Sequence, residues 1–203
     1  MTVVFIGTFD PFHGAHIGQL FRAYNYLNFS KVYVLVDKNP PHKPNASMWQ
    51  YRVEMVGLSL DELNMPFSYE IIPVRSSLAN EITQHIDYKV CGIDSLIDNL
   101  QDPERISYAF KWPMIVLSIP GIPKSQLTKI IDRLPEHKRH SVHYEYVNDQ
   151  NSPLLNYNYD LKKTMSNTIV HSSFIRSGQE LDFLAPSVRA YIQSHGLYAR
   201  RPK

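Results

Sequence analysis

The 203-residue sequence is poor in cysteine, in excess charge and in long apolar runs. Its single cysteine, Cys91, excludes an internal disulfide and is typical of a reducing compartment. A formal net charge of +2 is too small to indicate a nucleic-acid partner. No apolar stretch approaches the roughly 20 residues that a membrane-spanning helix needs. The first residues resemble a strand rather than a secretion signal, so we expect a cytoplasmic protein with no nucleic-acid or membrane partner.

The first half of the chain alternates short apolar runs with helical periodicity. The run Thr2–Ile6 is apolar and rich in β-branched residues, as in a strand buried on both faces of a parallel sheet. Apolar residues between 17 and 27 then recur at helical spacing, and Ser47 is placed to cap a second helix. Further strands are predicted at 31–36, 67–74, 88–92 and 114–119. This order predicts an α/β fold, a Rossmann-like parallel sheet with helices on both faces and ligands at the strands' carboxyl ends.

The remaining chain carries a weaker pattern. It predicts a helix at 125–134, a strand at 142–147, a polar loop at 148–158 and two short helices, one after Ser173 and one from Pro186 to His195. We expect one domain spanning 1–203, in which residues from about 160 onward form a small C-terminal helical region.

The turn from Gly7 to His16 joins the first strand to the first helix. A helix start offers free backbone N–H groups and the positive end of a dipole, which together suit a phosphate group. His13 and His16 are three residues apart at this helix opening, so both imidazoles can donate hydrogen bonds to a triphosphate. A His-x-x-His pair could also be half of a zinc site, but no third ligand is evident and no metal ligand is predicted.

The string Gly-Thr-Phe-Asp-Pro-Phe-His-Gly-Ala-His at 7–16 resembles the G-G/T-F-D-P-x-H-x-G-H signature of the HxGH nucleotidyltransferase superfamily. The resemblance implies transfer of a nucleoside monophosphate to an acceptor phosphate with release of pyrophosphate. It implies that His13 and His16 contact the triphosphate, and Ala15 stands where the signature has glycine. The resemblance implies a nucleotide site lined by Gly7, Thr8, Phe9 and Asp10.

A second string, Val-His-Ser-Ser-Phe-Ile-Arg at 170–176, resembles the I-S-S-T-x-I-R motif of the same superfamily, with His171 at the first serine position. Taken alone it is an ordinary capped helix start. Together with the first motif it implies a clamp on the ATP phosphates. Ser172, Ser173 and Ile175 would bind ATP, and Arg176 would act in catalysis.

Three further segments resemble bacterial nicotinate-nucleotide adenylyltransferases: Asn-Pro-Pro-His-Lys at 39–43, Arg-Val-Glu-Met at 52–55 and Gly-Ile-Asp-Ser-Leu at 92–96. The resemblance assigns Lys43 to catalysis and Gly92 and Asp94 to ATP binding. Arg52 and Thr83 are assigned to the acceptor. Simpler roles stay open: Lys43 as an exposed loop lysine, Asp94 as a helix cap and Arg52 as a surface ion-pair partner.

The resemblance therefore implies adenylyl transfer from ATP, accompanied by Mg²⁺, to nicotinate mononucleotide, forming the deamido-NAD dinucleotide. A homo-oligomer is compatible with the sequence. The S-Y-T and R-P-G segments of the adenylyltransferases are not matched at 76–83 and 119–121, so the acceptor is the least constrained part. Nicotinamide mononucleotide or another phosphomonoester, cytidylyl transfer, and a catalytically silent nucleotide-binding module are the alternatives.

Overall fold

The computed structural model describes residues 1–41, 43–75, 82–100, 111–117, 124–134, 136–139, 142–145, 172–178 and 181–199. The predicted loop at 148–158, His171 and the segments 76–81 and 119–121 lie outside these residues. None of the helices in the described ranges combines the length and the apolar character that crossing a bilayer requires.

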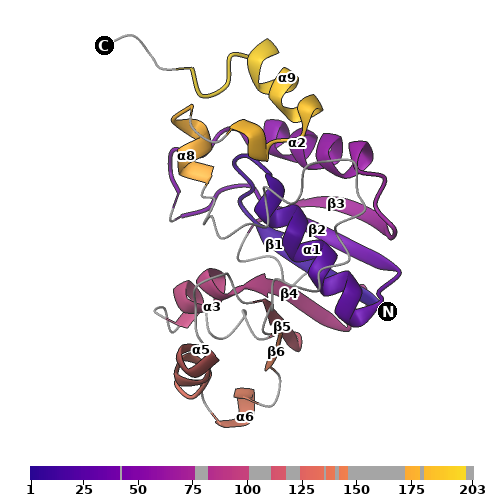
Figure 1. Ribbon diagram of the computed structural model, residues 1–203, viewed down its shortest axis with the longest axis vertical. Coiled ribbons are helices and arrows are strands. Elements are labelled where there is room, and N and C mark those ends of the chain that lie inside the picture. Colours follow the sequence, from indigo (N-terminus) through magenta and orange to yellow (C-terminus); the bar gives the residue numbers. More distant parts are fainter. Residues whose placement is uncertain are drawn as a thin grey trace.

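A parallel sheet forms the centre of the molecule (Figure 1). Across the described residues it has six strands in the order β3-β2-β1-β4-β5-β6, all parallel to their neighbours. All the predicted strands are present, which confirms the Rossmann-like parallel sheet. Their bounds are β1 Thr2–Gly7, β2 Lys31–Asp37, β3 Ser68–Val74, β4 Tyr88–Gly92, β5 Met114–Leu117 and β6 Val142–Glu145.

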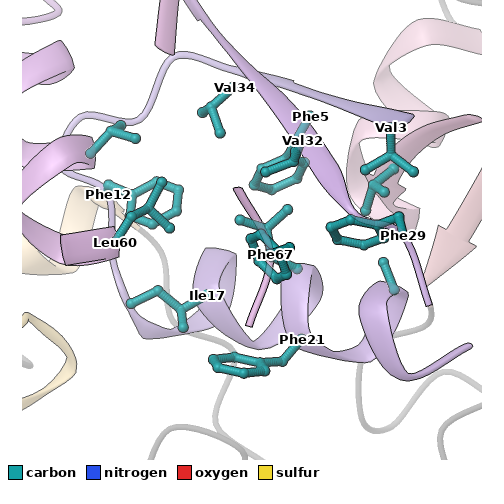
Figure 2. Close-up of a cluster of buried hydrophobic side chains, with 14 of the residues drawn as sticks. Val3, Phe5, Phe12, Ile17, Phe21, Phe29, Val32, Val34, Leu60 and Phe67 are labelled. Atoms are coloured by element: carbon teal, nitrogen blue, oxygen red, sulfur yellow. The ribbon is translucent and has the colours of Figure 1, made fainter. Parts of the chain in front are cut away.

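Helices cover both faces of the sheet, as predicted. Alternate residues of a strand point to opposite faces, and on β1 the side chains of Val3 and Phe5 join a core shared with α1 (Gly14–Leu27) and α2 (Trp49–Glu62). Figure 2 shows aromatic rings from separate elements, including Phe12, Phe21 and Phe67, filling this layer. On β4 and β5 the opposite face packs against α3 (Ile93–Leu100) and α5 (Lys124–Ile131).

The C-terminal helical region lies against α2. It contains α8 (Ser172–Arg176), a 3₁₀ turn η4 (Leu181–Phe183) and α9 (Pro186–Ser194), while the short α6 (Glu136–Arg139) precedes β6. A second apolar cluster, which we call the C-terminal cluster, joins α8 and α9 to α2 through Met55, Ile175, Leu184, Ala185, Val188 and Ile192. The carboxylate of Glu62 on α2 also accepts a hydrogen bond from the Ser187 N–H at 2.8 Å, at the start of α9. The start of α9 is thus tied to α2 by a hydrogen bond, and the helix packs against α2 along its apolar face.

Candidate active site

The predicted ATP-binding residues lie where the order of the sheet reverses. From β1 the chain proceeds to β2 on one side, whereas β4 lies on the other side of β1. In open parallel sheets the crevice at the carboxyl ends of such a strand pair is the usual ligand site. Gly7 ends β1 and Gly92 ends β4, and Asp94 follows in the first turn of α3. Two of the sequence motifs therefore meet on one edge of the sheet.

The loop after β1 is shaped by Phe9. Its backbone has a φ of 52°, in the left-handed region that residues with a side chain rarely adopt. The Phe9 ring is buried and lies 5.2 Å from the ring of Phe5 and 5.1 Å from that of His16, measured between centroids. A Cβ atom on Gly7 would lie only 2.5 Å from Phe9 Cε1. Glycine is therefore required at position 7, because the Phe9 ring occupies the space of a side chain.

His13 and His16 form a close pair at the start of α1, with ring centroids 3.9 Å apart. His13 is the N-cap residue, and its backbone N–H donates to Nδ1 of His16 at 3.2 Å. This bond places the proton of a neutral His16 on Nε2, where it is available as a donor. Phe12 stacks on the His16 ring at 5.2 Å with an interplanar angle of 17°. Burial lowers the pKa of His16, and the nearby charges of His13 and Lys43 lower it further, so the imidazole is neutral near pH 7.

The second motif lies directly on the first. The Ser172 hydroxyl is 3.1 Å from Nε2 of His13 and 3.4 Å from the carbonyl oxygen of Pro11, to which it donates. A guanidinium N–H of Arg176 donates to the carbonyl oxygen of Asp10 at 2.6 Å. The structure thus brings the first motif, which carries the two imidazoles, and the second motif, which carries the serine hydroxyls, into one site.

The neighbouring residues of α8 differ in exposure. Ser173 is exposed, so its hydroxyl is accessible to a ligand. Ile175 is 2% exposed and belongs to the C-terminal cluster. Packing is therefore the role that the structure gives the Ile175 side chain, and the assignment of this residue to ATP binding stays a prediction.

The buried side chain of Asp10 links the loop after β1 to three other segments of the chain. Its side chain is 2% exposed. The carboxylate accepts hydrogen bonds from the N–H and the hydroxyl of Ser47 and, at 2.6 Å, from the hydroxyl of Tyr198. A nitrogen of Arg176 lies 3.8 Å from the other carboxylate oxygen. The predicted Ser47 cap of α2 is wrong: Met48 is the N-cap residue, and the Ser47 hydroxyl bonds Asp10 instead.

The contacts of Arg52 differ most from those that the sequence predicts. It is 1% exposed, and its guanidinium donates to four bonds with backbone carbonyls. These carbonyls belong to Thr8, Asp37, Lys38 and Ser47. With most of its five N–H groups committed in this way, Arg52 holds the loops after β1 and β2 and the start of α2 together. The structure therefore favours a scaffolding role over the acceptor contact or the surface ion pair expected from the sequence.

The remaining predicted residues are placed as follows. Lys43 is exposed on the loop between β2 and α2, and its charge acts on His16. Thr83 is exposed on the segment that precedes β4, and its role in acceptor binding stays a prediction.

Two residues of the first motif serve the packing of the loop and helix. Thr8 is buried, and its carbonyl oxygen accepts a hydrogen bond from Arg52. Ala15, in the place of the signature glycine, packs against the C-terminal cluster. Among the described residues, no group of three or more His, Cys, Asp or Glu is arranged to hold a metal ion.

Sequence reasoning missed the part played by Tyr198. Its contact with Asp10 spans 188 positions, so no local periodicity could indicate it. The sequence carries a weak signal for this residue, because the closing segment, with Gly-Leu-Tyr at 196–198, also resembles the end of the nicotinate-nucleotide adenylyltransferases.

Comparison with known proteins places this geometry in a family. The model of the cytidylyltransferase-like family matches residues 4–146, which include the His13–His16 pair and all six described strands apart from the first two residues of β1. The chain belongs to this cytidylyltransferase-like family. It is therefore a nucleotidyltransferase with the family's Rossmann-like fold.

Individual relatives show how far the likeness extends. The chain is 28% identical to a probable nicotinate-nucleotide adenylyltransferase of Clostridium perfringens strain SM101, over 97% of either protein. It is 36% identical to the phosphopantetheine adenylyltransferase of Histophilus somni strain 2336, over only 48% of this chain and 58% of that one. A Plasmodium falciparum nicotinic acid mononucleotide adenylyltransferase, solved in complex with NaAD, covers 98% of each chain with a TM-score of 0.66. At 16% identity this last likeness shows the fold alone.

Proposed function

We propose that the chain is a nicotinate-nucleotide adenylyltransferase. It transfers AMP from ATP to the phosphate of nicotinate mononucleotide, releases pyrophosphate and forms the deamido-NAD dinucleotide. The observation that carries the proposal is the 3.1 Å approach of Ser172 to His13, which unites both phosphate-binding motifs at one helix start. The full-length similarity to an adenylyltransferase from Clostridium perfringens supports the choice of acceptor.

The proposed reaction is a direct in-line displacement. The acceptor's phosphate oxygen attacks the α-phosphorus of ATP while the bond to the pyrophosphate oxygen breaks. A phosphate monoester is already a dianion near neutral pH, so the reaction needs no general base. The protein contributes position and charge stabilisation, which dominate related phosphoryl chemistry.

The histidine pair would supply much of that stabilisation. Neutral His16 presents Nε2–H as a donor, because its Nδ1 already accepts from the backbone of His13. An arriving triphosphate favours the charged form of an imidazole, so the donor strengthens as negative charge develops on the leaving pyrophosphate. Arg176 would add positive charge from α8, and the exposed Lys43 would reach the phosphates from its loop.

Magnesium would enter as part of the MgATP substrate. The described residues offer no ready-made cluster of metal ligands, and the Asp10 carboxylate is committed to Ser47 and Tyr198. Mg²⁺ prefers oxygen ligands, keeps several waters and is commonly held by substrate phosphates. The residues present therefore fit an ion that the nucleotide would bring, which the chain would hold through the ATP phosphates.

Cytidylyl transfer is the second candidate, because the matching family model is described as cytidylyltransferase-like. A pyrophosphate-release assay with Mg²⁺ separates the two when ATP and CTP are each combined with nicotinate mononucleotide, nicotinamide mononucleotide, phosphopantetheine or glycerol phosphate. We expect release with ATP and nicotinate mononucleotide above every other pair. A preference for CTP, or for a different acceptor, would overturn the proposal. Tight ATP binding without release for any acceptor would support a silent nucleotide-binding module.

A further inference from the structure

We infer that Tyr198 is a positioning residue for ATP, acting through Asp10 on the phosphate-binding loop. The inference rests on the proposed function and extends it to the C-terminal segment, which lies outside the 4–146 range shared with the family model. Tyr198 touches neither reactant in this account. Its hydroxyl bonds the residue that connects the loop after β1 with α8.

The contact itself is buried and well formed. The Tyr198 hydroxyl donates to Oδ1 of Asp10 at 2.6 Å, and the same oxygen accepts from the Ser47 hydroxyl. Burial raises the pKa of Tyr198, and the adjacent Asp10 carboxylate raises it further, so the phenol keeps its proton and remains a donor. A carboxylate that is 2% exposed needs such donors, because no solvent replaces one that is lost.

Asp10 passes this restraint to the phosphate site by two routes. Along the chain it lies between Phe9, whose ring packs on His16, and Pro11, whose carbonyl accepts from Ser172. Through space its carbonyl oxygen accepts from Arg176 at 2.6 Å, and its Oδ2, which accepts from the Ser47 N–H, lies 3.8 Å from the same guanidinium. If Asp10 loses the Tyr198 donor, its carboxylate is drawn toward Arg176, and the loop and α8 shift together.

The backbone conformation after α9 indicates that surrounding contacts hold Tyr198 in place. After α9 the chain turns back with φ values of +58° at Gly196 and +61° at Tyr198. Glycine adopts this region readily, but a bulky aromatic residue rarely does. Such a conformation persists where surrounding contacts over-determine it. Here the conformation brings the phenol to Asp10, and the Tyr198 ring also packs against the C-terminal cluster.

The expected effect of losing the hydroxyl is selective for ATP. Tyr198→Phe keeps the ring and its packing, so the fold should persist. We expect Kd for the non-hydrolysable analogue α,β-methylene-ATP with Mg²⁺ to rise about five- to tenfold, since hydrogen bonds to charged groups are among the stronger ones. The KM for ATP should rise similarly, and the KM for nicotinate mononucleotide should stay near that of the wild type. A general loss of stability would not raise the KM for ATP while leaving the KM for nicotinate mononucleotide unchanged.

The test is isothermal titration of the full-length chain with α,β-methylene-ATP and Mg²⁺, combined with steady-state kinetics. Tyr191→Phe is the matched control, because it removes a hydroxyl from the adjacent α9, where the ring packs against α2. Ser47→Ala is the second variant, since it removes the other donor to the same carboxylate oxygen. We expect weaker binding for Tyr198→Phe and Ser47→Ala, and wild-type binding for Tyr191→Phe.

Unchanged Kd in a folded Tyr198→Phe protein would overturn the inference, as would equal rises in both KM values. If thermal melting shows that Tyr198→Phe does not fold, Ser47→Ala decides by the same criteria. A wild-type protein that binds the analogue but transfers nothing to nicotinate mononucleotide would overturn the proposed function, while the comparison of Kd values still tests Tyr198. A wild-type protein that does not bind the analogue would overturn both.

Discussion

The hydroxyl of Ser172 lies 3.1 Å from Nε2 of His13, although 159 positions separate the two residues in the chain. His13 is the N-cap residue of α1, at the end of the loop after β1, and Ser172 begins α8 in the C-terminal region. Neither element alone provides more than an ordinary helix start. Their contact makes one site from two distant motifs, and it gives the proposed ATP site donors from both ends of the chain.

Ser172→Ala should lower kcat/KM for ATP about ten- to a hundredfold, because one donor beside the phosphates is lost and such a bond is worth about 1.5–3 kcal/mol. Ser125→Ala, on the exposed side of α5, is the surface control and should leave the rate unchanged. Initial rates at limiting ATP give the comparison. A Ser172→Ala protein with the wild-type kcat/KM would show that this hydroxyl does not contribute to the site.

Gly7→Ala should abolish most nucleotide binding, because its methyl group would collide with the Phe9 ring at 2.5 Å. The ring would have to leave its place between Phe5 and His16, and the loop would move with it. Gly18→Ala is the matched control, since a Cβ there meets nothing within 4 Å and lies inside α1. We expect Gly18→Ala to raise the free energy of unfolding by about 0.5–1 kcal/mol and to retain activity. Wild-type affinity for ATP in the Gly7→Ala protein would contradict the described packing.

Arg52→Ala should lower the free energy of unfolding by about 2–4 kcal/mol, because it leaves buried or half-buried carbonyl oxygens of three segments without their donor. Arg139 also donates to two backbone carbonyls but is exposed, so Arg139→Ala should change the stability by less than about 1 kcal/mol. Urea denaturation measures both. If Arg52→Ala is as stable as the wild type and instead raises only the KM of the acceptor, the role predicted from sequence would replace the scaffolding role.

The stability should depend on the protonation of His16. Its pKa is lowered in the folded state, first by burial and then by His13 and Lys43. The unfolded chain therefore binds more protons than the folded one below the ordinary histidine pKa of about 6.5. The free energy of unfolding should then fall as the pH drops below about 6.5, with a slope of at most about 1.4 kcal/mol per pH unit from this group. Urea denaturation at pH 7.5 and 5.5 should show a smaller loss for His16→Asn than for the wild type. The exposed His195 provides the control variant His195→Asn, and equal losses in all three proteins would refute the assignment.

The strands were predictable from sequence because their information is local. Short β-branched runs such as Thr2–Ile6 and 31–36 are buried on both faces of the sheet, so their composition alone identifies them. The order of the motifs also predicted which loops lie at the carboxyl edge, since parallel strands present these ends together. The helix from Pro186 was marked in the same way by proline at a helix start.

The roles of Ser47, Arg52 and Ile175 were not predictable, because each depends on a partner distant in the chain. A serine before a helix is normally a cap, but here the buried Asp10 carboxylate competes for its hydroxyl. An arginine on an amphipathic helix is normally exposed, but the converging loops around Arg52 present carbonyl oxygens that need a donor. The Ile175 side chain of the second motif is packed inward because Met55 on α2 and residues of the C-terminal helical region surround it. Local patterns thus predicted the elements, and tertiary contacts decided what several side chains do.

The most direct test of the proposed function measures pyrophosphate and dinucleotide together. The wild-type chain is incubated with MgATP and nicotinate mononucleotide, pyrophosphate is followed continuously, and the product is identified by mass spectrometry. We predict equal amounts of pyrophosphate and deamido-NAD, and a fall in kcat of about 10²–10³ for a folded His16→Ala protein. A wild-type chain that forms no dinucleotide, or a His16→Ala protein with near-normal turnover, would contradict the account.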